Sequence, residues 1–349
     1  MLYNQHVGQK LMATKNKVIS KQIYFIITRK CNYKCSFCIR NNLKEQNVDM
    51  SLENAKTILW NIHKYAPKSV IVITGGEPLF HPECENFIRH ALSLYDHVIL
   101  TTNGSFNEEK AEMLIPYLKN NLWLQFSLDG PRNVHDEIRG KGAYDKVIKN
   151  LTLLEEVSSH LLISSTIGSN NYKNISELAI ALNSYKFSRW KLTMEIVKDP
   201  LCDMPLDISI WNSMIDEVLP LCYFNVRAQK YYDFDLMERF LISQEQHPVE
   251  LITNCGSGKN TFVINPDFSV VPCTCMNEII GNFITDNTEI LLSKLENHCQ
   301  LDPDEESICF SCKYKAICKG GCPGYSKKCF GKFNMGDLRC PLVKESMNV

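Results

Sequence analysis

The stretch 22–38, QIYFIITRKCNYKCSFC, joins a short apolar run to a loop that carries three cysteines. In the run Gln22–Thr28, isoleucine and phenylalanine recur at every second position, which is typical of a β-strand with one face in a core. The loop that follows has the spacing CxxxCxxC, formed by Cys31, Cys35 and Cys38. A strand that ends in clustered thiols suggests a metal site at the edge of a sheet.

Similar apolar runs, each followed by an amphipathic helix pattern, recur from about Lys21 to Glu195. The runs are rich in Ile, Val and Leu, which is typical of a parallel sheet covered by helices on both faces. We therefore predict an α/β fold, a partial (β/α)6 TIM-like barrel whose strand ends share one rim. After 22–28, the strands are expected over 69–74, 98–102, 122–127, 161–167 and 190–194, and the helices over 51–65 (N-cap Ser51), 82–95, 107–119, 144–155 and 174–182.

The pattern changes after about Asp199, so four parts are expected. Two helices, over 208–222 and 233–244, lead to a cysteine-dense tail with a hairpin over 261–271 that turns at Asn265-Pro266-Asp267. The predicted parts are an N-terminal extension (1–20), the barrel (21–199), a helical connector (200–250) and the tail (251–349).

Composition excludes several classes of protein. The chain has 349 residues, 44% of them hydrophobic, and its 38 basic and 39 acidic residues give a net charge of −1, which argues against a nucleic-acid binder. No apolar run reaches the ~18 residues that span a bilayer, and the N-terminus lacks the apolar segment of a signal peptide. We expect a soluble, cytoplasmic chain that binds neither nucleic acid nor membrane.

Sixteen cysteines are the unusual feature of the composition. Because no secretory signal is present, reduced thiols that bind iron or zinc are favoured over disulfides. Three thiolates in one short loop can hold three irons of a [4Fe–4S] cube and leave the fourth iron open. A zinc site completed by histidine, or thiols without a role, are the alternatives.

The motif CxxxCxxC after the first strand resembles that of the radical S-adenosylmethionine (SAM) enzymes. The resemblance implies that Cys31, Cys35 and Cys38 bind a [4Fe–4S] cluster whose open iron takes up the amine and carboxylate of SAM. It also implies that Phe37 packs near the adenine, although a phenylalanine at this place is also ordinary core. An electron from flavodoxin or ferredoxin would then yield a 5′-deoxyadenosyl radical that abstracts a hydrogen atom from the substrate.

Motifs at the next strand ends extend the same resemblance. The stretch Gly75-Gly76-Glu77-Pro78 matches the segment that binds the methionine amine, with glycines that let the backbone approach a ligand. For Glu77, the alternative to ligand contact is a purely structural role within this loop. In the motifs Thr102-Asn103-Gly104 and Ser127-Leu128-Asp129-Gly130, the residues Asn103 and Ser127 correspond to ribose and carboxylate contacts. Arg139 is frequent in the same subgroup, but an exposed, salt-bridged arginine is equally expected.

The tail resembles the SPASM extension, which binds two auxiliary iron–sulfur clusters in peptide-modifying radical SAM enzymes. Position 268, which matches a glycine of the pattern, is Phe268, so Asn265 or Asp267 is expected to take the left-handed conformation of the turn. The correspondence implies Cys309, Cys312, Cys318 and Cys340 as ligands of the distal cluster and Cys255, Cys273 and Cys322 as ligands of the nearer one.

Cys275 is the spare thiol closest to the nearer cluster in sequence. Cys275 is one candidate for the fourth ligand of that cluster, and an open iron is the alternative. If Cys275 does not bind iron, it is a candidate catalytic residue that returns a hydrogen atom to a peptide radical, as in an epimerase. A zinc ribbon is the alternative for 309–322. The remaining cysteines are expected to be buried or unpaired: Cys84, Cys202, Cys222, Cys299 and Cys329.

The resemblance implies an oxidoreductase-type enzyme that modifies a ribosomally made precursor peptide or protein, and an oxidative crosslink is the first expectation. The alternative is an anaerobic sulfatase maturase that forms formylglycine. Thr274 stands where that family usually has an aspartate after the cysteine. A multi-cluster electron carrier is the non-enzyme alternative. The first 20 residues are too few for a winged-helix peptide-binding domain, so a separate leader-binding protein is a further expected partner.

Overall fold

A computed structural model of the chain describes residues 21–39, 48–197, 205–243, 254–299 and 302–347. Its centre is one mixed sheet with the strand order β10-β9-β8-β1-β2-β3-β4-β5-β6-β7. The strands are β1 (Gln22–Thr28), β2 (Val70–Gly75), β3 (His97–Thr102), β4 (Leu122–Ser127), β5 (Leu161–Ile167), β6 (Arg189–Met194), β7 (Val226–Arg227), β8 (Thr261–Ile264), β9 (Ser269–Val271) and β10 (Gly281–Asn282).

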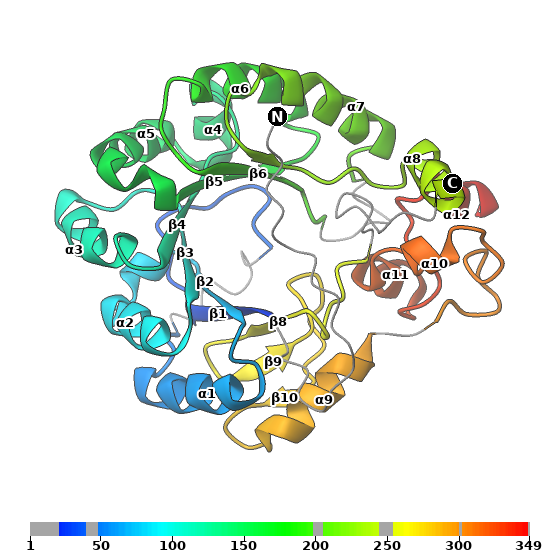
Figure 1. Cartoon of the computed structure of the whole chain (residues 1–349), viewed down its shortest axis with the longest axis horizontal. Coiled ribbons are helices and arrows are strands. Elements are labelled where there is room, and N and C mark those ends of the chain that lie inside the picture. The colour runs from blue at the N-terminus through cyan, green and yellow to red at the C-terminus, as the bar shows by residue number, and fades with distance from the viewer. Residues whose placement is uncertain (1–20, 40–47, 198–204, 244–253, 300–301, 348–349) are drawn as a thin grey trace.

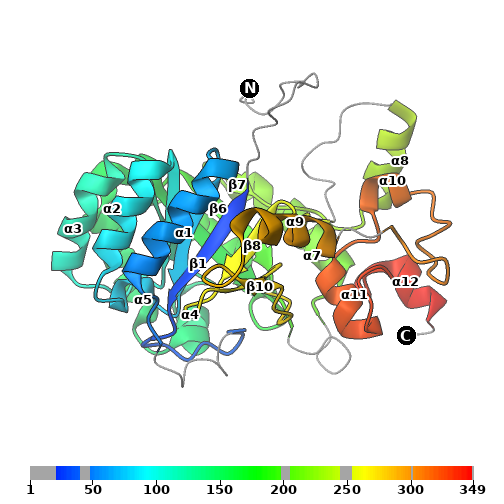
Figure 2. The same ribbon diagram turned by 90° about the horizontal axis from the view of Figure 1, so that it is seen from below.

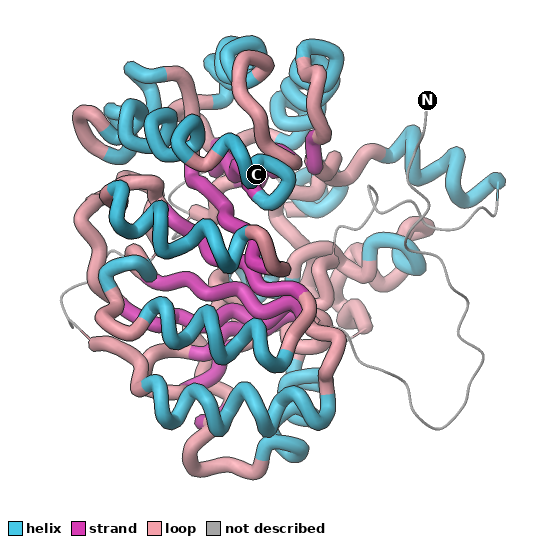
Figure 3. The backbone as a smooth tube through the Cα atoms, turned by 60° about the vertical axis from the view of Figure 1, so that its left-hand side comes forward, coloured by secondary structure: helices cyan, strands magenta, loops and turns pink. Residues whose placement is uncertain are grey.

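The helices lie outside the curved sheet (Figures 1 and 3). Within the barrel they are α1 (Leu52–Tyr65), α2 (Cys84–Leu94), α3 (Glu108–Leu118), α4 (Arg132–Arg139), α5 (Ala143–Leu153) and α6 (Ile175–Leu182). Further along they are α7 (Ile208–Val218), α8 (Phe234–Ser243), α9 (Thr288–His298), α10 (Lys315–Cys318), α11 (Pro323–Phe330) and α12 (Pro341–Ser346).

All six predicted barrel strands are confirmed within one residue at each end, and neighbouring strands pair in parallel. The sequence signals act as expected: the side chain of Ser51 caps α1 by accepting from the Asn54 N–H at 3.4 Å. The side of the sheet under the helices carries the main hydrophobic core, with Phe25, Phe126 and Trp190 almost fully buried. The short helix α4 was not predicted, because only Val134 and Ile138 of its eight residues are apolar, although these two share one buried face.

The tail is joined to the barrel through the sheet itself. β8 pairs in parallel with β1, in the register Gln22↔Thr261 to Phe25↔Ile264, and β9 and β10 extend the sheet further. The predicted hairpin is therefore confirmed, but its place at the barrel edge was not foreseen. The helices α10, α11 and α12 stand at one side of the barrel (Figure 2). The division of the chain into parts stays a prediction, and the extension 1–20 lies outside the described residues.

The turn of this hairpin differs from the expectation. Neither Asn265 nor Asp267 is left-handed; Phe268 itself has φ of 65°. The Phe268 N–H donates to the Asn265 carbonyl at 2.8 Å, and its side chain is buried in the main core. Burial of the aromatic ring thus holds a non-glycine residue in a conformation that glycine favours.

None of the described helices has the length and apolar character needed to cross a membrane.

Candidate metal and cofactor centres

The thiols of the CxxxCxxC loop lie together beyond the end of β1. Cys35 is buried against Tyr33 and Ala143, and Cys31, Phe37 and Cys38 pack on the same small cluster. The loop is anchored by the Ser36 N–H, which donates to the Ile138 carbonyl at 3.4 Å. The structure therefore brings the three predicted ligands to the rim formed by the strand ends, while iron binding by them stays a prediction.

No three Cys, His, Asp or Glu side chains converge on one ion position within the described part of the chain. A cube does not require such convergence, because each thiolate binds a different iron. No disulfide joins the described cysteines to one another, so their sulfurs are chemically suited to iron.

The glycines after β2 serve a close approach of two backbones. The Gly76 N–H donates to the Thr28 carbonyl at 2.8 Å, and the Glu77 N–H donates to the Lys30 carbonyl at 2.7 Å. A Cβ atom on Gly76 would overlap the Lys30 carbonyl. From the sequence, we expected the missing side chains of these glycines to let a ligand approach the backbone. In the structure, the group that approaches is the backbone of the segment directly before Cys31. Ligand binding by Gly75, Gly76 and Pro78 stays a prediction.

Glu77 is buried below this rim, and both its carboxylate oxygens have protein partners. One oxygen accepts from the Thr102 hydroxyl at 2.9 Å and the Leu79 N–H at 3.3 Å, and the other accepts from the Asn103 N–H at 2.7 Å. Burial outweighs these hydrogen bonds and raises the pKa of Glu77 to about 7. The sequence left two roles open for Glu77, contact with a ligand or a structural role. The geometry favours the structural role, in which Glu77 holds the loops at the strand ends together.

Asn103 and Ser127 lie on the same rim. The Asn103 Nδ2 donates to the Asn32 Oδ1 at 2.9 Å and lies 3.9 Å from the Cys31 Sγ. Ser127 ends β4 and pairs in register with Ser164. Asn103 therefore positions the cysteine loop directly, and contact of either residue with SAM stays a prediction.

Arg139 is buried rather than exposed. Its Nε donates to the Asp129 Oδ2 at 2.5 Å, and the two side chains are 9% and 0% exposed. The guanidinium carbon lies 5.4 Å from the centre of the Phe37 ring, and Cys35 and Cys31 act on the guanidinium electrostatically. A fixed cation thus stands beside the three thiols, where it can bind a carboxylate.

Asp129 was not singled out from the sequence. Its Oδ1 accepts from the Thr166 N–H at 2.9 Å, and its own N–H donates to the Nδ1 of His135 at 3.0 Å. The available signal was an acidic residue directly after an apolar strand, in the motif ending at Gly130. That signal is weak without knowledge of its partner Arg139.

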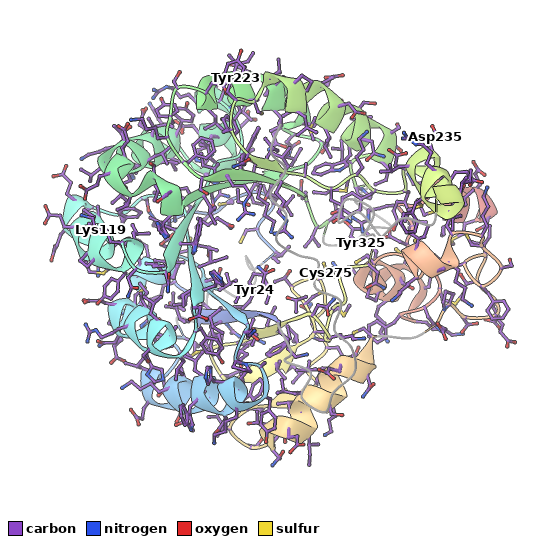
Figure 4. The ribbon with its side chains drawn as sticks, in the orientation of Figure 1. Tyr24, Lys119, Tyr223, Asp235, Cys275 and Tyr325 are labelled. Atoms are coloured by element: carbon purple, nitrogen blue, oxygen red, sulfur yellow. The ribbon has the colours of Figure 1, made fainter. Side chains whose placement is uncertain are left out.

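A second group of thiols lies in the tail, near the labelled Cys275 (Figure 4). The Cys275 thiol contacts the thiols of Cys273 and Cys322, and the Cys275 N–H donates to the Cys273 Sγ at 3.2 Å. The hydrogen bond from Cys275 lowers the pKa of Cys273 to about 7. Cys255 is close enough to interact electrostatically with Cys273 and Cys322. The three predicted ligands and the spare thiol therefore share one place.

The third group surrounds a cavity below α8 and α10. Cys309, Cys312, Cys318 and Cys340 all line it. These are the four residues that the resemblance assigned to the distal cluster. Four thiols around one cavity match the ligand requirement of a [4Fe–4S] cube.

A buried ion pair separates the two tail groups. The Arg339 Nη2 donates to the Asp337 Oδ2 at 2.7 Å, and that oxygen also accepts from the Cys322 N–H at 3.1 Å. The guanidinium stacks on Tyr325, 4.0 Å from the ring centre. Sequence reasoning missed this pair, because the stretch Asp337-Leu338-Arg339 resembles an ordinary exposed segment.

Among the other cysteines, Cys84 and Cys299 are buried as predicted. The Cys222 thiol donates to the Val218 carbonyl at 3.4 Å. Cys202 lies outside the described residues.

Comparison with known protein families and curated proteins adds the following. Residues 25–179 match the radical SAM superfamily. The chain is 27% identical to the sporulation killing factor maturation protein SkfB of Bacillus subtilis, over 91% of this chain and 71% of SkfB. It is 23% identical to a cysteine-type anaerobic sulfatase-maturating enzyme of Clostridium novyi, over 84% of each. It is 21% identical to the subtilosin biosynthesis protein AlbA of Bacillus subtilis, over 85% of this chain and 66% of AlbA.

Solved structures share the fold. Streptococcus suis SuiB superposes with a TM-score of 0.75 at 18% identity, over 93% of this chain and 77% of that one, and SuiB has also been solved with its precursor peptide SuiA. The protein anSMEcpe with bound S-adenosylmethionine gives a TM-score of 0.70 at 18% identity, over 93% and 95% of the two chains. The barrel and tail therefore form an arrangement already seen in other proteins.

Proposed function

We propose that this chain, whose residues 25–179 match the radical SAM superfamily, is an enzyme of that superfamily and a peptide maturase. Its substrate would be a ribosomally made precursor peptide, and an oxidative crosslink is the modification that we favour. The relatives named for peptide maturation support this class. The observation that carries the proposal is the set of three thiol groups: one on the barrel rim beside a buried arginine, and two in the tail.

We assign the cluster that binds SAM to Cys31, Cys35 and Cys38. When bound, this cluster and SAM supply hydrogen-atom abstraction from the peptide. The chain's own part is to hold and orient them. Asp129 fixes the guanidinium of Arg139 over Phe37, which prepares that cation to bind the carboxylate of SAM without further ordering. Asn103 holds the cysteine loop, and Glu77 braces the loops below it.

We assign the auxiliary clusters to the two groups in the tail. Cys309, Cys312, Cys318 and Cys340 surround the distal site. Cys255, Cys273 and Cys322 would bind the nearer cluster, with Cys275 as the fourth ligand, because its thiol contacts two of them. This assignment disfavours Cys275 as a hydrogen-atom donor. An electron donor of the flavodoxin or ferredoxin type is part of the proposal.

Iron content tests the assignment of Cys275. Three complete cubes contain about 12 Fe per chain; Cys275→Ala would leave the nearer cube with three thiolates and one open iron, so we expect that iron to be lost and the content to fall to about 11. The matched control is Cys84→Ala, which removes a buried cysteine outside the three groups and is expected to keep the full iron content. Full iron in Cys275→Ala, together with a changed product, would instead favour the catalytic role.

Intact mass spectrometry tests the maturase activity. Each short peptide encoded beside this gene is co-expressed anaerobically with the wild-type enzyme, with Cys35→Ala or with Cys84→Ala. We expect one peptide to lose two hydrogens with the wild type and with Cys84→Ala, but not with Cys35→Ala. An unchanged mass in water together with uptake of deuterium from D2O would indicate epimerisation in place of a crosslink.

The second candidate is sulfatase maturation, which the full-length similarity to the C. novyi enzyme supports. The chain has Thr274 after Cys273, where an aspartate is usual in that family, so we rank it second. A peptide with a cysteine-type sulfatase motif is the direct substrate. Conversion of its cysteine to formylglycine, without any change in the neighbouring peptides, would replace our first proposal.

A further inference from the structure

Three basic side chains lie on the inner face of the sheet, in the first half of β6 and in β7. In β6, Trp190, Leu192 and Met194 enter the hydrophobic core under the helices. Because successive side chains of a strand alternate between faces, Arg189 and Lys191 lie on the opposite, inner face. Arg227 of β7 is paired with Lys191 in the sheet register, and its side chain therefore shares that face.

No carboxylate of the described residues compensates these three charges. Burial, Arg227 and Arg189 lower the pKa of Lys191, and no carboxylate is among the groups that act on it. Burial and Arg227 likewise lower the pKa of Arg189. Among the residues that the structure describes, none of the three forms a salt bridge. Arg189 and Lys191 are partly desolvated beside the exposed Arg227, and like charges without a counterion among the described residues cost free energy, so their grouping points to a bound anion.

The sheet register relates these cations to the proposed SAM site. Ser127 of β4 pairs with Ser164 of β5, Ser164 pairs with Lys191 of β6, and Lys191 pairs with Arg227 of β7. One polar row thus crosses the inner face from Ser127 to Arg227. Neighbouring strands are ~4.8 Å apart, so Lys191 lies about 10 Å from Ser127 along the row. That separation is about the length of three extended peptide residues.

We propose that Lys191 and Arg227, supported by Arg189, bind a carboxylate of the peptide substrate close to the residue that is modified. The expected substrate therefore carries an aspartate or glutamate within about three residues of the modified residue, or has that residue equally close to its C-terminal carboxylate. This inference rests on the proposed maturase function for the peptide nature of the ligand. The binding of a carboxylate to the cationic row can be measured without turnover.

The binding test uses three capped or open tripeptides with the iron-loaded enzyme and SAM, followed by calorimetry or saturation-transfer NMR. The probes are acetyl-Gly-Glu-Gly-amide, acetyl-Gly-Gln-Gly-amide and acetyl-Gly-Gly-Gly with a free C-terminal carboxylate. We expect a carboxylate probe to bind about tenfold tighter than the glutamine probe, which corresponds to one charge-assisted hydrogen bond. Preference for the glutamate probe assigns a side-chain carboxylate, and preference for the open probe assigns the C-terminus.

Variants connect binding to the row. Lys191→Met and Arg227→Met are each expected to remove most of the preference for the carboxylate. Lys186→Met is the matched control, because Lys186 is an exposed lysine paired with Glu155, and it is expected to change nothing. Equal binding of all probes, no binding of any probe, or an unchanged preference in both row variants would overturn the proposal. Loss of SAM binding in Lys191→Met would do so too, because the row would then hold the cofactor.

The melting temperature of Lys191→Met distinguishes an anion-binding lysine from a lysine that stabilises the fold, because the two roles predict shifts of opposite sign. Removing one of several uncompensated charges is expected to raise the Tm of Lys191→Met above that of the wild type. A clearly lower Tm would identify Lys191 as a stabilising residue and contradict the proposal. If the neighbouring peptides show no mass change but the carboxylate preference is intact, the maturase assignment fails while the anion site stands.

Discussion

At the scale of single residues, Glu77 illustrates how a motif and its role differ. The stretch Gly75–Pro78 was recognised because of what it binds in similar enzymes, yet the carboxylate in it is bonded to Thr102, Asn103 and Leu79. It ties the ends of β2 and β3 together under the cysteine loop. A buried carboxylate with three donors is a structural element in itself.

The raised pKa of Glu77 predicts a pH dependence of stability. Its folded-state pKa is about 7 against an ordinary 4.5, so its contribution is fully present below pH 4.5 and is lost as the pH rises through 7. Relative to Glu77→Gln, the wild type should lose roughly 2.5 kcal/mol of unfolding free energy between pH 5 and 7.5. Anaerobic urea unfolding of the metal-free protein measures this. The exposed control Glu109→Gln should track the wild type, and a constant difference from Glu77→Gln would contradict the assigned burial.

Phe268 allows a second residue-scale prediction. Both Phe268→Ala and Phe268→Gly lose the packing of a buried ring, which costs about 3–5 kcal/mol. Because φ at this position is 65°, alanine also retains the left-handed strain of about 1–2 kcal/mol that glycine avoids. We expect Phe268→Gly to be more stable than Phe268→Ala by about 1 kcal/mol in urea unfolding.

A control for this comparison is Thr57 on the exposed face of α1. There the order should reverse, with alanine about 1 kcal/mol more stable than glycine, as usual within a helix. The same order at both positions would show that the turn relaxes when the ring is removed.

At the scale of helices and strands, the periodicity of apolar residues and the N-cap residues were sufficient to predict most elements of the barrel. The strands β1, β4 and β5 have the predicted bounds, and α1 begins after the predicted cap. The elements that were not predicted are segments stabilised by partners far away in the sequence. The two-residue strands β7 and β10 exist only because β6 and β9 pair with them, and so short a segment has no period of its own.

The contact between barrel and tail leads to an element-scale prediction. Lys21, directly before β1, donates to the Lys259 carbonyl at 2.5 Å and pairs with Glu296 of α9 at 2.7 Å, with side chains 1% and 34% exposed. Lys21→Met leaves a half-buried carboxylate without its partner and should cost about 2 kcal/mol.

The loss should appear as faster amide hydrogen exchange in β8 and α9, while β3 and β4 are unchanged. Lys259→Met is the control, because only the backbone carbonyl of Lys259 is used. If exchange rises uniformly over the barrel, or not at all, Lys21 does not connect the two parts.

At the scale of the whole molecule, the barrel and tail differ in what stabilises them. The large core continues from the barrel into the tail, where it includes Cys340 and Val343, whereas Cys312 of the distal site packs against a small separate cluster of Met237, Tyr314 and Ile317. Where few apolar groups are buried, bound metal commonly supplies the folding free energy.

We therefore predict that removing iron with a chelator loosens the tail before the barrel. Hydrogen exchange over 309–340 should increase at least tenfold in the metal-free protein, while exchange in β1 to β6 changes little. In a Cys309→Ala, Cys312→Ala double variant, the same segment should already exchange fast, and chelation should add little. Equal protection with and without iron would show that protein contacts alone hold the tail.

The sequence by itself determined the parts of this protein that depend on local order. Apolar period and N-caps predicted the strands and helices of the barrel, and the resemblance of the cysteine motifs to known families implied which thiols belong together. Only the tertiary structure decided how distant residues meet: the pair Asp129–Arg139, the contact of Cys275 with Cys322, and the register that aligns Ser127 with Lys191. Periodicity and spacing depend on neighbours within one turn or strand, whereas these contacts depend on sheet register and helix packing, which are set by the molecule as a whole.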